Sequence, residues 1–191
     1  MNTASASTAI QQAQDAFTRR RVLDLLFDSA GWGLVTLAQL AVTAAMAGVL
    51  SSAVGWAVTA PWAVVLSTTV MGKATYATMF RRRPLSDKQV AYHIRLFIYS
   101  AFMVGAMWAF AGWYLYPPFN EELRLFLVFV LGGISLSAVG TQHIYLPVCY
   151  ASMGLAVPVL ALRFFIDGHV IEPLLLTLYT LILFRLASSI S

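Results

Sequence analysis

The sequence predicts an all-α fold, a polytopic membrane bundle of six transmembrane helices arranged as three hairpins. The chain of 191 residues is 60% hydrophobic and only 10% charged, whereas a soluble domain carries about 25% charged residues. Its mean hydropathy is +0.77. It also contains several long runs without a charge, and roughly 20 apolar residues are enough for a helix to cross a bilayer. These observations exclude an ordinary water-soluble domain.

Residues 29–72 contain no formally charged side chain and predict the first hairpin. This run is long enough for two crossings, and Gly55 with the serines before it supplies the turn. Lys73 follows the run directly, and we expect it to snorkel toward lipid headgroups. Residues 1–21 are predicted to be a cytoplasmic tail and juxtamembrane segment that begins as disordered chain. Residues 22–191 are predicted to form the transmembrane domain.

Three further uncharged or nearly uncharged runs supply the other four crossings. Residues 96–120 give one crossing, and residues 125–162 give two, divided at residues 140–143. Residues 173–191 contain a single charge, Arg185, and give the sixth. Pro158 falls in the middle of the fifth predicted helix, where a proline removes a backbone hydrogen bond and bends the helix. This bend is either a hinge or an ordinary kink.

The charged loops predict the orientation of the bundle. Arginine triplets at residues 19–21 and 81–83 precede the first and third helices, and an excess of Lys and Arg marks the cytoplasmic side. An even number of crossings then places both termini in the cytoplasm. The net charge of +4 therefore belongs to membrane flanks, so we predict no nucleic-acid partner and a lipid bilayer as the main one.

No catalytic motif is present in the sequence. It lacks a phosphate-binding glycine loop, HExxH and GxSxG. No Asp or Glu falls inside a predicted span, which counts against a proton-coupled carrier. The single cysteine, Cys149, excludes an internal disulfide framework. We therefore assign no catalytic residue to this chain.

A ligand site is predicted in the outer half of the bundle, between the third and fifth helices. It would use Trp108, Trp113 and Tyr114 with the cation of Arg163, a combination suited to an anionic or carbonyl ligand. The competing interpretation is that Arg163 snorkels to the headgroups or pairs with Asp167 one turn later.

His93 and His143 both fall near the predicted inner face and are weak candidates for a metal or haem site. Two imidazoles that ligate a haem lie inside helices with an apolar pocket between them, whereas His143 lies in a short polar connection. Hydrogen-bonded interfacial histidines are the favoured interpretation. We therefore predict no cofactor.

Small residues recur at helical spacing on two of the predicted helices. Such stripes let helix backbones approach closely, either within the bundle or at a dimer seam, and packing within the bundle is the favoured interpretation. The stripes are Ala101, Gly105 and Ala109, and Gly133, Ser137 and Thr141.

The sequence resembles the N-terminal membrane modules of bacterial diguanylate cyclases of the GGDEF class. The resemblance lies in the arginine triplet followed by Pro84 and in residues 105–109, 115–118, 132–135, 145–147 and 157–163. Related modules precede sensor histidine kinases. The resemblance implies a homodimer in the bacterial inner membrane whose last helix continues into an output domain making cyclic di-GMP. It also implies an unknown small-molecule or lipid-soluble ligand.

The resemblance covers residues 81–168 well and the first hairpin only by pattern. No output domain follows Ser191 in this sequence, so we expect a membrane module from a longer signal-transduction polypeptide, and no activity is assigned to the chain itself. The alternatives are a stand-alone small carrier or channel, a haem-bearing redox module and a passive membrane anchor.

Overall fold

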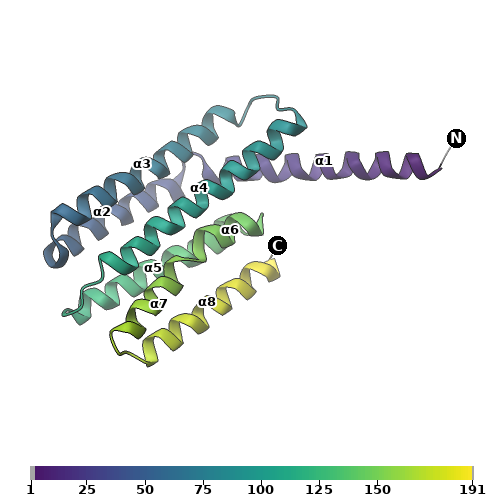
Figure 1. Cartoon of the computed structure of the whole chain (residues 1–191). Coiled ribbons are helices and arrows are strands. Elements are labelled where there is room, and N and C mark those ends of the chain that lie inside the picture. The colour runs from purple at the N-terminus through teal and green to yellow at the C-terminus, as the bar shows by residue number, and fades with distance from the viewer. Residues whose placement is uncertain (1–2, 191) are drawn as a thin grey trace.

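The structure, a computed structural model, describes residues 3–190, and for residues 3–10, 12 and 13 it describes the backbone alone. Every regular element within this range is an α-helix, which confirms the all-α prediction (Figure 1). The helices are α1 (Thr3–Ala30), α2 (Leu34–Val54), α3 (Trp56–Phe80), α4 (Asp87–Tyr114), α5 (Glu121–Gln142), α6 (Leu146–Met153), α7 (Ala156–Ile166) and α8 (Ile171–Ile190).

The helices lie side by side along one long axis, and both chain termini lie toward the same end of the bundle (Figure 1). Helix α2 packs against α3, α4 packs against α6 and α7, and α7 packs against α8. Helices α6 and α7 follow one another along a single path and together fill the place of the predicted fifth span.

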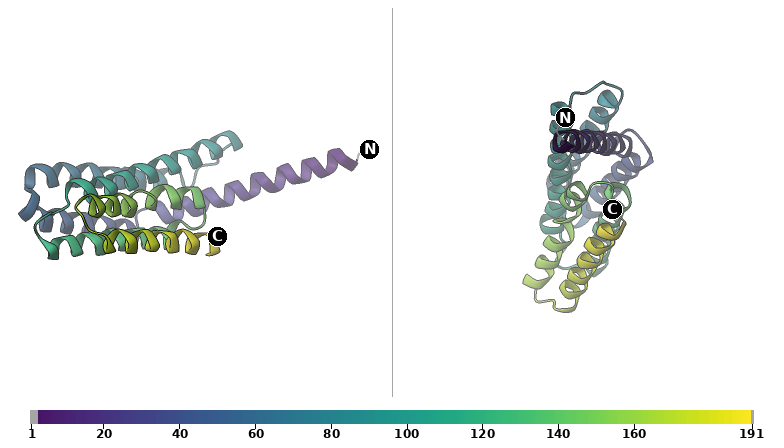
Figure 2. Two further views of the ribbon diagram at one scale, coloured as in Figure 1. Left: turned by 60° about the horizontal axis from the view of Figure 1, so that its bottom comes forward. Right: turned by 90° about the vertical axis from the view of Figure 1, so that its right-hand side faces the viewer.

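Helix α1 is continuous from Thr3, so the expectation of a disordered start is wrong from that residue on, and residues 1 and 2 lie outside the described residues. The segment is rich in alanine and has no glycine or proline before Gly31, and both features favour a helix. Its first half projects beyond the bundle (Figure 2), and Phe17 is 74% exposed. Its last turns enter the core, where Leu23, Leu26 and Phe27 are each 1% exposed.

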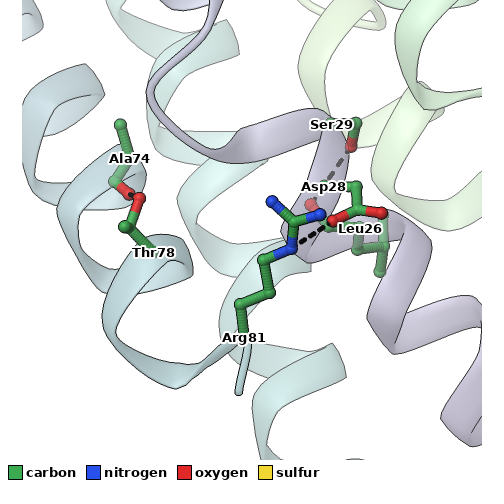
Figure 3. A network of polar contacts seen from close by, with 6 residues as sticks. All are labelled: Leu26, Asp28, Ser29, Ala74, Thr78 and Arg81. Atoms are coloured by element: carbon green, nitrogen blue, oxygen red, sulfur yellow. Dashed lines mark hydrogen bonds and ion pairs between the residues drawn. The ribbon is translucent and has the colours of Figure 1, made fainter.

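An ion pair joins the end of α1 to the end of α3. Arg81 Nε lies 2.6 Å from Asp28 Oδ1, with both side chains about half exposed. Figure 3 shows this pair beside two hydroxyl groups that bond to carbonyls of their own helices, Ser29 to Leu26 and Thr78 to Ala74. The pair thus links the last turn of α1 to the end of α3.

Five helical segments of the described chain are long and apolar enough to span a membrane, not the six predicted. The exception is α3, because Lys73 and many threonines lower its hydropathy. Several of these hydroxyls bond to carbonyls four residues earlier, as Thr69 does to Val65, which satisfies them inside the helix. Helix α3 nevertheless returns alongside α2, because Gly55, with φ of +89°, is the only residue between them.

The fifth predicted span is interrupted at Gly154 and Leu155, just before Pro158. Pro158 has no N–H to donate to the Gly154 carbonyl four residues earlier, so the interruption lies where the predicted proline bend should fall. The end of α6 lies against Gly105 of α4, where an added Cβ would lie 2.6 Å from the Ser152 carbonyl oxygen. The small-residue stripe of α4 therefore serves close packing inside the bundle, as favoured from the sequence.

Large apolar side chains cover much of the outer surface. On α8 alone, Leu174, Leu178 and Leu181 are 70%, 54% and 60% exposed. Soluble monomers rarely expose a continuous apolar surface of this kind. This surface agrees with the composition in indicating a membrane protein.

Candidate functional site

Two of the four predicted ligand-site residues, Trp113 and Arg163, lie together. They lie at the end of the bundle opposite the chain termini, where loops join α4 to α5 and α7 to α8, and we call this the loop end. The Arg163 guanidinium lies 5.7 Å from the centroid of the Trp113 ring and 5.2 Å from that of Tyr116. Arg163 Nη2 also lies 3.4 Å from Asp167 Oδ1. The pairing of Arg163 with Asp167, the competing interpretation of the sequence, is therefore confirmed.

A second arginine, Arg124, extends this cluster across α5 and α8. Its Nη1 donates to His169 Nε2 at 2.7 Å and to the Tyr116 hydroxyl at 3.5 Å. Since His169 Nε2 accepts from an arginine, the imidazole proton belongs on Nδ1, which faces Glu172 Oε1 at 3.2 Å. Burial raises the pKa of Tyr116, so its hydroxyl stays protonated at neutral pH.

Local sequence explains why these side chains meet. Asn120 caps α5 by accepting from the Leu123 N–H at 3.0 Å, which places Arg124 in the first turn of the helix. At the other edge, Gly168 has φ of +85°. The His169 N–H bonds to the Phe164 carbonyl and the Gly168 N–H to the Phe165 carbonyl. This pattern ends α7 and turns His169 back toward Arg124.

We refer to Arg124, Arg163, His169, Asp167 and Glu172, with the Tyr116 hydroxyl, as the loop-end cluster. Most of its charges have a partner within the cluster. Buried Nε atoms of Arg124 and Arg163 are the exceptions. Because α5, α7, α8 and the α4–α5 loop each contribute, the cluster is suited to holding these segments in register.

The other two predicted residues lie elsewhere. Trp108 is fully buried in the core and meets Trp62 edge to face, with ring centroids 5.4 Å apart. Trp62 Nε1 donates to the Met107 carbonyl at 2.8 Å, whereas Trp108 Nε1 has no hydrogen-bond partner. Tyr114 is 61% exposed and stacks on Phe110. The predicted set of four therefore does not form one site.

Trp108 instead lines a cleft of about 500 Å³ whose walls come from α2, α4, α5 and the Ser152 region of α6. We call this the α2–α5 cleft. Its lining is mostly apolar, and two side chains that line it on the outer surface, Leu34 and Phe129, are 83% and 76% exposed. Its volume is in the range of sites that hold one small ligand.

A smaller enclosed cavity of about 50 Å³ continues from the cleft into the bundle. The two share six lining residues: Val35, Gln39, Val104, Thr141, Gln142 and Ser152. We call it the inner cavity. Lys73 lines it from α3, and the Lys73 ammonium lies 5.9 Å from the centroid of the Phe97 ring, which is 2% exposed. Lys73 is partly buried and lies between the inner cavity and a groove on the bundle surface, so its snorkelling stays a prediction.

Lys73 has no ion-pair partner among the described residues. Gln142 Oε1, on the wall of the same inner cavity, is buried and has no hydrogen-bond partner. The cavity thus brings together a partly buried cation without an ion pair and a buried amide oxygen without a hydrogen-bond partner. A buried polar group without a partner is costly, so such groups require an explanation.

His93 and His143 have separate surroundings. His93 is buried among aromatic rings, and its Nδ1 bonds to the Tyr76 hydroxyl. His143 Nδ1 lies 3.1 Å from the Val139 carbonyl oxygen of its own helix. In the described chain, no group of three or more His, Cys, Asp or Glu side chains is placed to hold a metal ion.

Sequence reasoning missed the inner cavity and four of the six residues of the loop-end cluster. The available signal for Lys73 was a lysine seven residues before the end of a helix that otherwise carries no charge, since ionisable residues in such positions mark functional sites by default. For Arg124 and His169 there was no local signal, because they lie far apart in sequence.

Comparisons with known proteins found no matching family model, no matching curated protein and no matching solved structure.

Proposed function

We propose that the chain is the membrane-embedded sensor or anchor module of a bacterial signal-transduction protein of the inner membrane. As a homodimer, it would set the alignment of a cytoplasmic output domain that follows α8, a diguanylate cyclase making cyclic di-GMP. The observation that supports this most is that α1 and α8 meet the same end of the bundle (Figure 1). A histidine kinase output would use the same mechanism.

Six crossings and cytoplasmic termini belong to this proposal. If α2 crosses the membrane, α3 must return through the same depth, because one residue joins the two antiparallel helices. Its hydroxyls are satisfied on its own backbone, which lets a helix of modest hydropathy lie in lipid. The arginine triplets then lie on the cytoplasmic side.

The path for a signal would run from α6 to α8. The break at Gly154 and Leu155 lets α6 and α7 move separately, with Pro158 just beyond it as the predicted hinge. Helix α7 is tied to α8 through the loop-end cluster, and Tyr179 of α8 donates to the Gly132 carbonyl of α5 at 2.7 Å. A ligand would act through its differential affinity for two arrangements, and a near-complete switch needs about 5.5 kcal/mol.

The test is a series of insertions behind α8. One to four alanines are inserted between Ser191 and an attached diguanylate cyclase domain, and cellular cyclic di-GMP is measured. Each added residue rotates the output by about 100°, so production should rise and fall with the helical period. A flexible Gly-Ser spacer of equal length, as the control, should abolish the periodicity. Equal production for every insertion would refute the proposal.

A second candidate is a stand-alone small carrier, and the observation in its favour is the inner cavity with its unpaired lysine. A carrier needs polar groups along a continuous path across the bilayer. The core between the inner cavity and the loop-end cluster is instead apolar, with Leu131, Trp108 and Leu160 fully buried. This region favours the sensor over the carrier.

A further inference from the structure

We propose that the α2–α5 cleft and the inner cavity together form a binding site for a single-chain amphiphile with a carboxylate head. The carboxylate would pair with Lys73 in the inner cavity, and the acyl chain would occupy the cleft. This inference deepens the proposed function by naming the ligand class of a sensor, and in that respect it rests on it.

The head-group end is defined by charge. Lys73 is the only formally charged residue that lines either space, and no carboxylate of the described chain lines them. A cation in this position is stabilised by an anion that brings the opposite charge and hydrogen-bond acceptors. The inner cavity of about 50 Å³ admits a group no larger than a carboxylate with bound water.

The part of the site that would hold the acyl chain is defined by its shape and polarity. Val42, Phe129, Val130 and Ile134 supply an apolar wall that runs along the bundle from the inner cavity toward Trp108. The side chains beside this wall are exposed and would face lipid in a membrane. An amphiphile dissolved in the bilayer could therefore slide in sideways without crossing water. Two acyl chains would exceed the cleft, so a phospholipid is not the occupant we propose.

Two further polar atoms suit such a ligand. The buried Trp108 Nε1 lacks an acceptor and Gln142 Oε1 lacks a donor, and both residues line the cleft. An oxygen substituent along the chain could accept from Trp108, and a water or hydroxyl beside the head could donate to Gln142. The unsatisfied groups are thus distributed along the cleft, as an elongated ligand requires.

Gly133 supplies the sharpest variant, because it lines the cleft and an added Cβ there would meet no atom within 4 Å. Gly133→Leu should therefore fill the cleft while leaving the fold intact. Gly140→Leu is the matched control, since Gly140 lies on the same helix, is equally open and does not line the cleft. For the head group, Lys73→Met is paired with Lys88→Met at an exposed site.

The probe is 12-bromododecanoic acid, whose bromine quenches tryptophan fluorescence on contact, added to the purified full chain in nanodiscs at pH 8. Probe dissolved in the lipid gives a non-saturating background from the exposed Trp32 and Trp56. Above it we expect a saturable component of quenching that Trp108→Phe reduces. Lys73→Met should weaken binding at least about tenfold, as loss of a buried charge partner does, and Gly133→Leu should abolish it. Lys88→Met and Gly140→Leu should bind like the wild type. The neutral 12-bromododecanol should bind much more weakly than the acid.

Equal binding of acid and alcohol, or unchanged binding by Lys73→Met, would overturn the proposal. So would the absence of a saturable component of quenching. A Gly133→Leu protein that loses its dimer would also overturn it, since a second copy of the chain would then be the occupant of the cleft. This assay measures binding of the acid to the cleft and does not depend on an output domain. Its failure would leave the insertion test behind α8 unaffected, so the site and the proposed function can fail separately.

Discussion

Partly buried cations lie at both ends of the bundle, but their surroundings differ. At the loop end, Arg124 and Arg163 each contact hydrogen-bond or ion-pair partners from neighbouring segments. Toward the other end, Lys73 reaches the inner cavity without an anion among the described residues. The comparison teaches that a charge inside a bundle is structural where partners surround it, and a candidate for ligand binding where they are missing.

The largest effect on stability is expected in the loop-end cluster, where the arginines have partners. Arg124→Met removes the donor to His169 and leaves Glu172 without the charge that balances it. Hydrogen bonds that involve charged groups contribute about 1.5–3 kcal/mol, so we expect the free energy of unfolding to fall by about 2 kcal/mol. Thermal unfolding in detergent, followed by circular dichroism, measures this. An unchanged midpoint would show that the loop-end cluster does not hold the helices together.

Replacement of Lys73 should change the free energy of unfolding in the opposite direction. Lys73→Met replaces an unpaired cation with an apolar side chain of similar length, so it removes a desolvation cost without breaking an ion pair. We expect the free energy of unfolding of the ligand-free protein to rise by about 1 kcal/mol. The same unfolding measurement applies, with Lys88→Met as the control. A loss of stability as large as that of Arg124→Met would mean that Lys73 has a structural partner and would erase the contrast.

The smallest expected effect is a difference in stability between variants of the two core tryptophans, Trp62 and Trp108. Trp62→Phe loses a hydrogen bond to the Met107 carbonyl, whereas Trp108→Phe loses none. Hydrogen bonds between membrane helices average about 0.6 kcal/mol, and the loss of ring volume is the same in both variants. Trp62→Phe should therefore be the less stable by about that amount. Equal stabilities would indicate that Trp108 Nε1 also has a partner.

Much of the fold could be predicted because apolar composition and charged loops act locally. The hairpin turn at Gly55 and the helical runs on both sides of it follow from residue order alone. The sixth span was not confirmed because the sequence argument counted formal charges alone, whereas Lys73 and the threonines lower the hydropathy of α3. The interruption at Gly154 follows from Pro158, whereas the close contact of Gly105 with the Ser152 carbonyl could not be predicted, because it depends on which faces of α4 and α6 meet.

The candidate site was harder to predict because it depends on contacts between helices that lie far apart in sequence. Trp113 and Arg163 were placed together because both fall near one end of their helices. Trp108 was grouped with them by depth, but the rotation of α4 turns it into the core beside Trp62. The surroundings of Lys73 depend on which faces of α2, α4 and α5 meet, and a single sequence does not record that.

The central claim is that the bundle lies in a membrane with both chain ends on the cytoplasmic side. Its direct test is labelling of single cysteines by a membrane-impermeant maleimide in intact bacteria, after replacement of the buried Cys149 by serine. Phe119→Cys, at a fully exposed position between α4 and α5, should react in whole cells. Arg82→Cys should react only after the cells are opened. Labelling of Arg82→Cys in intact cells would contradict the account.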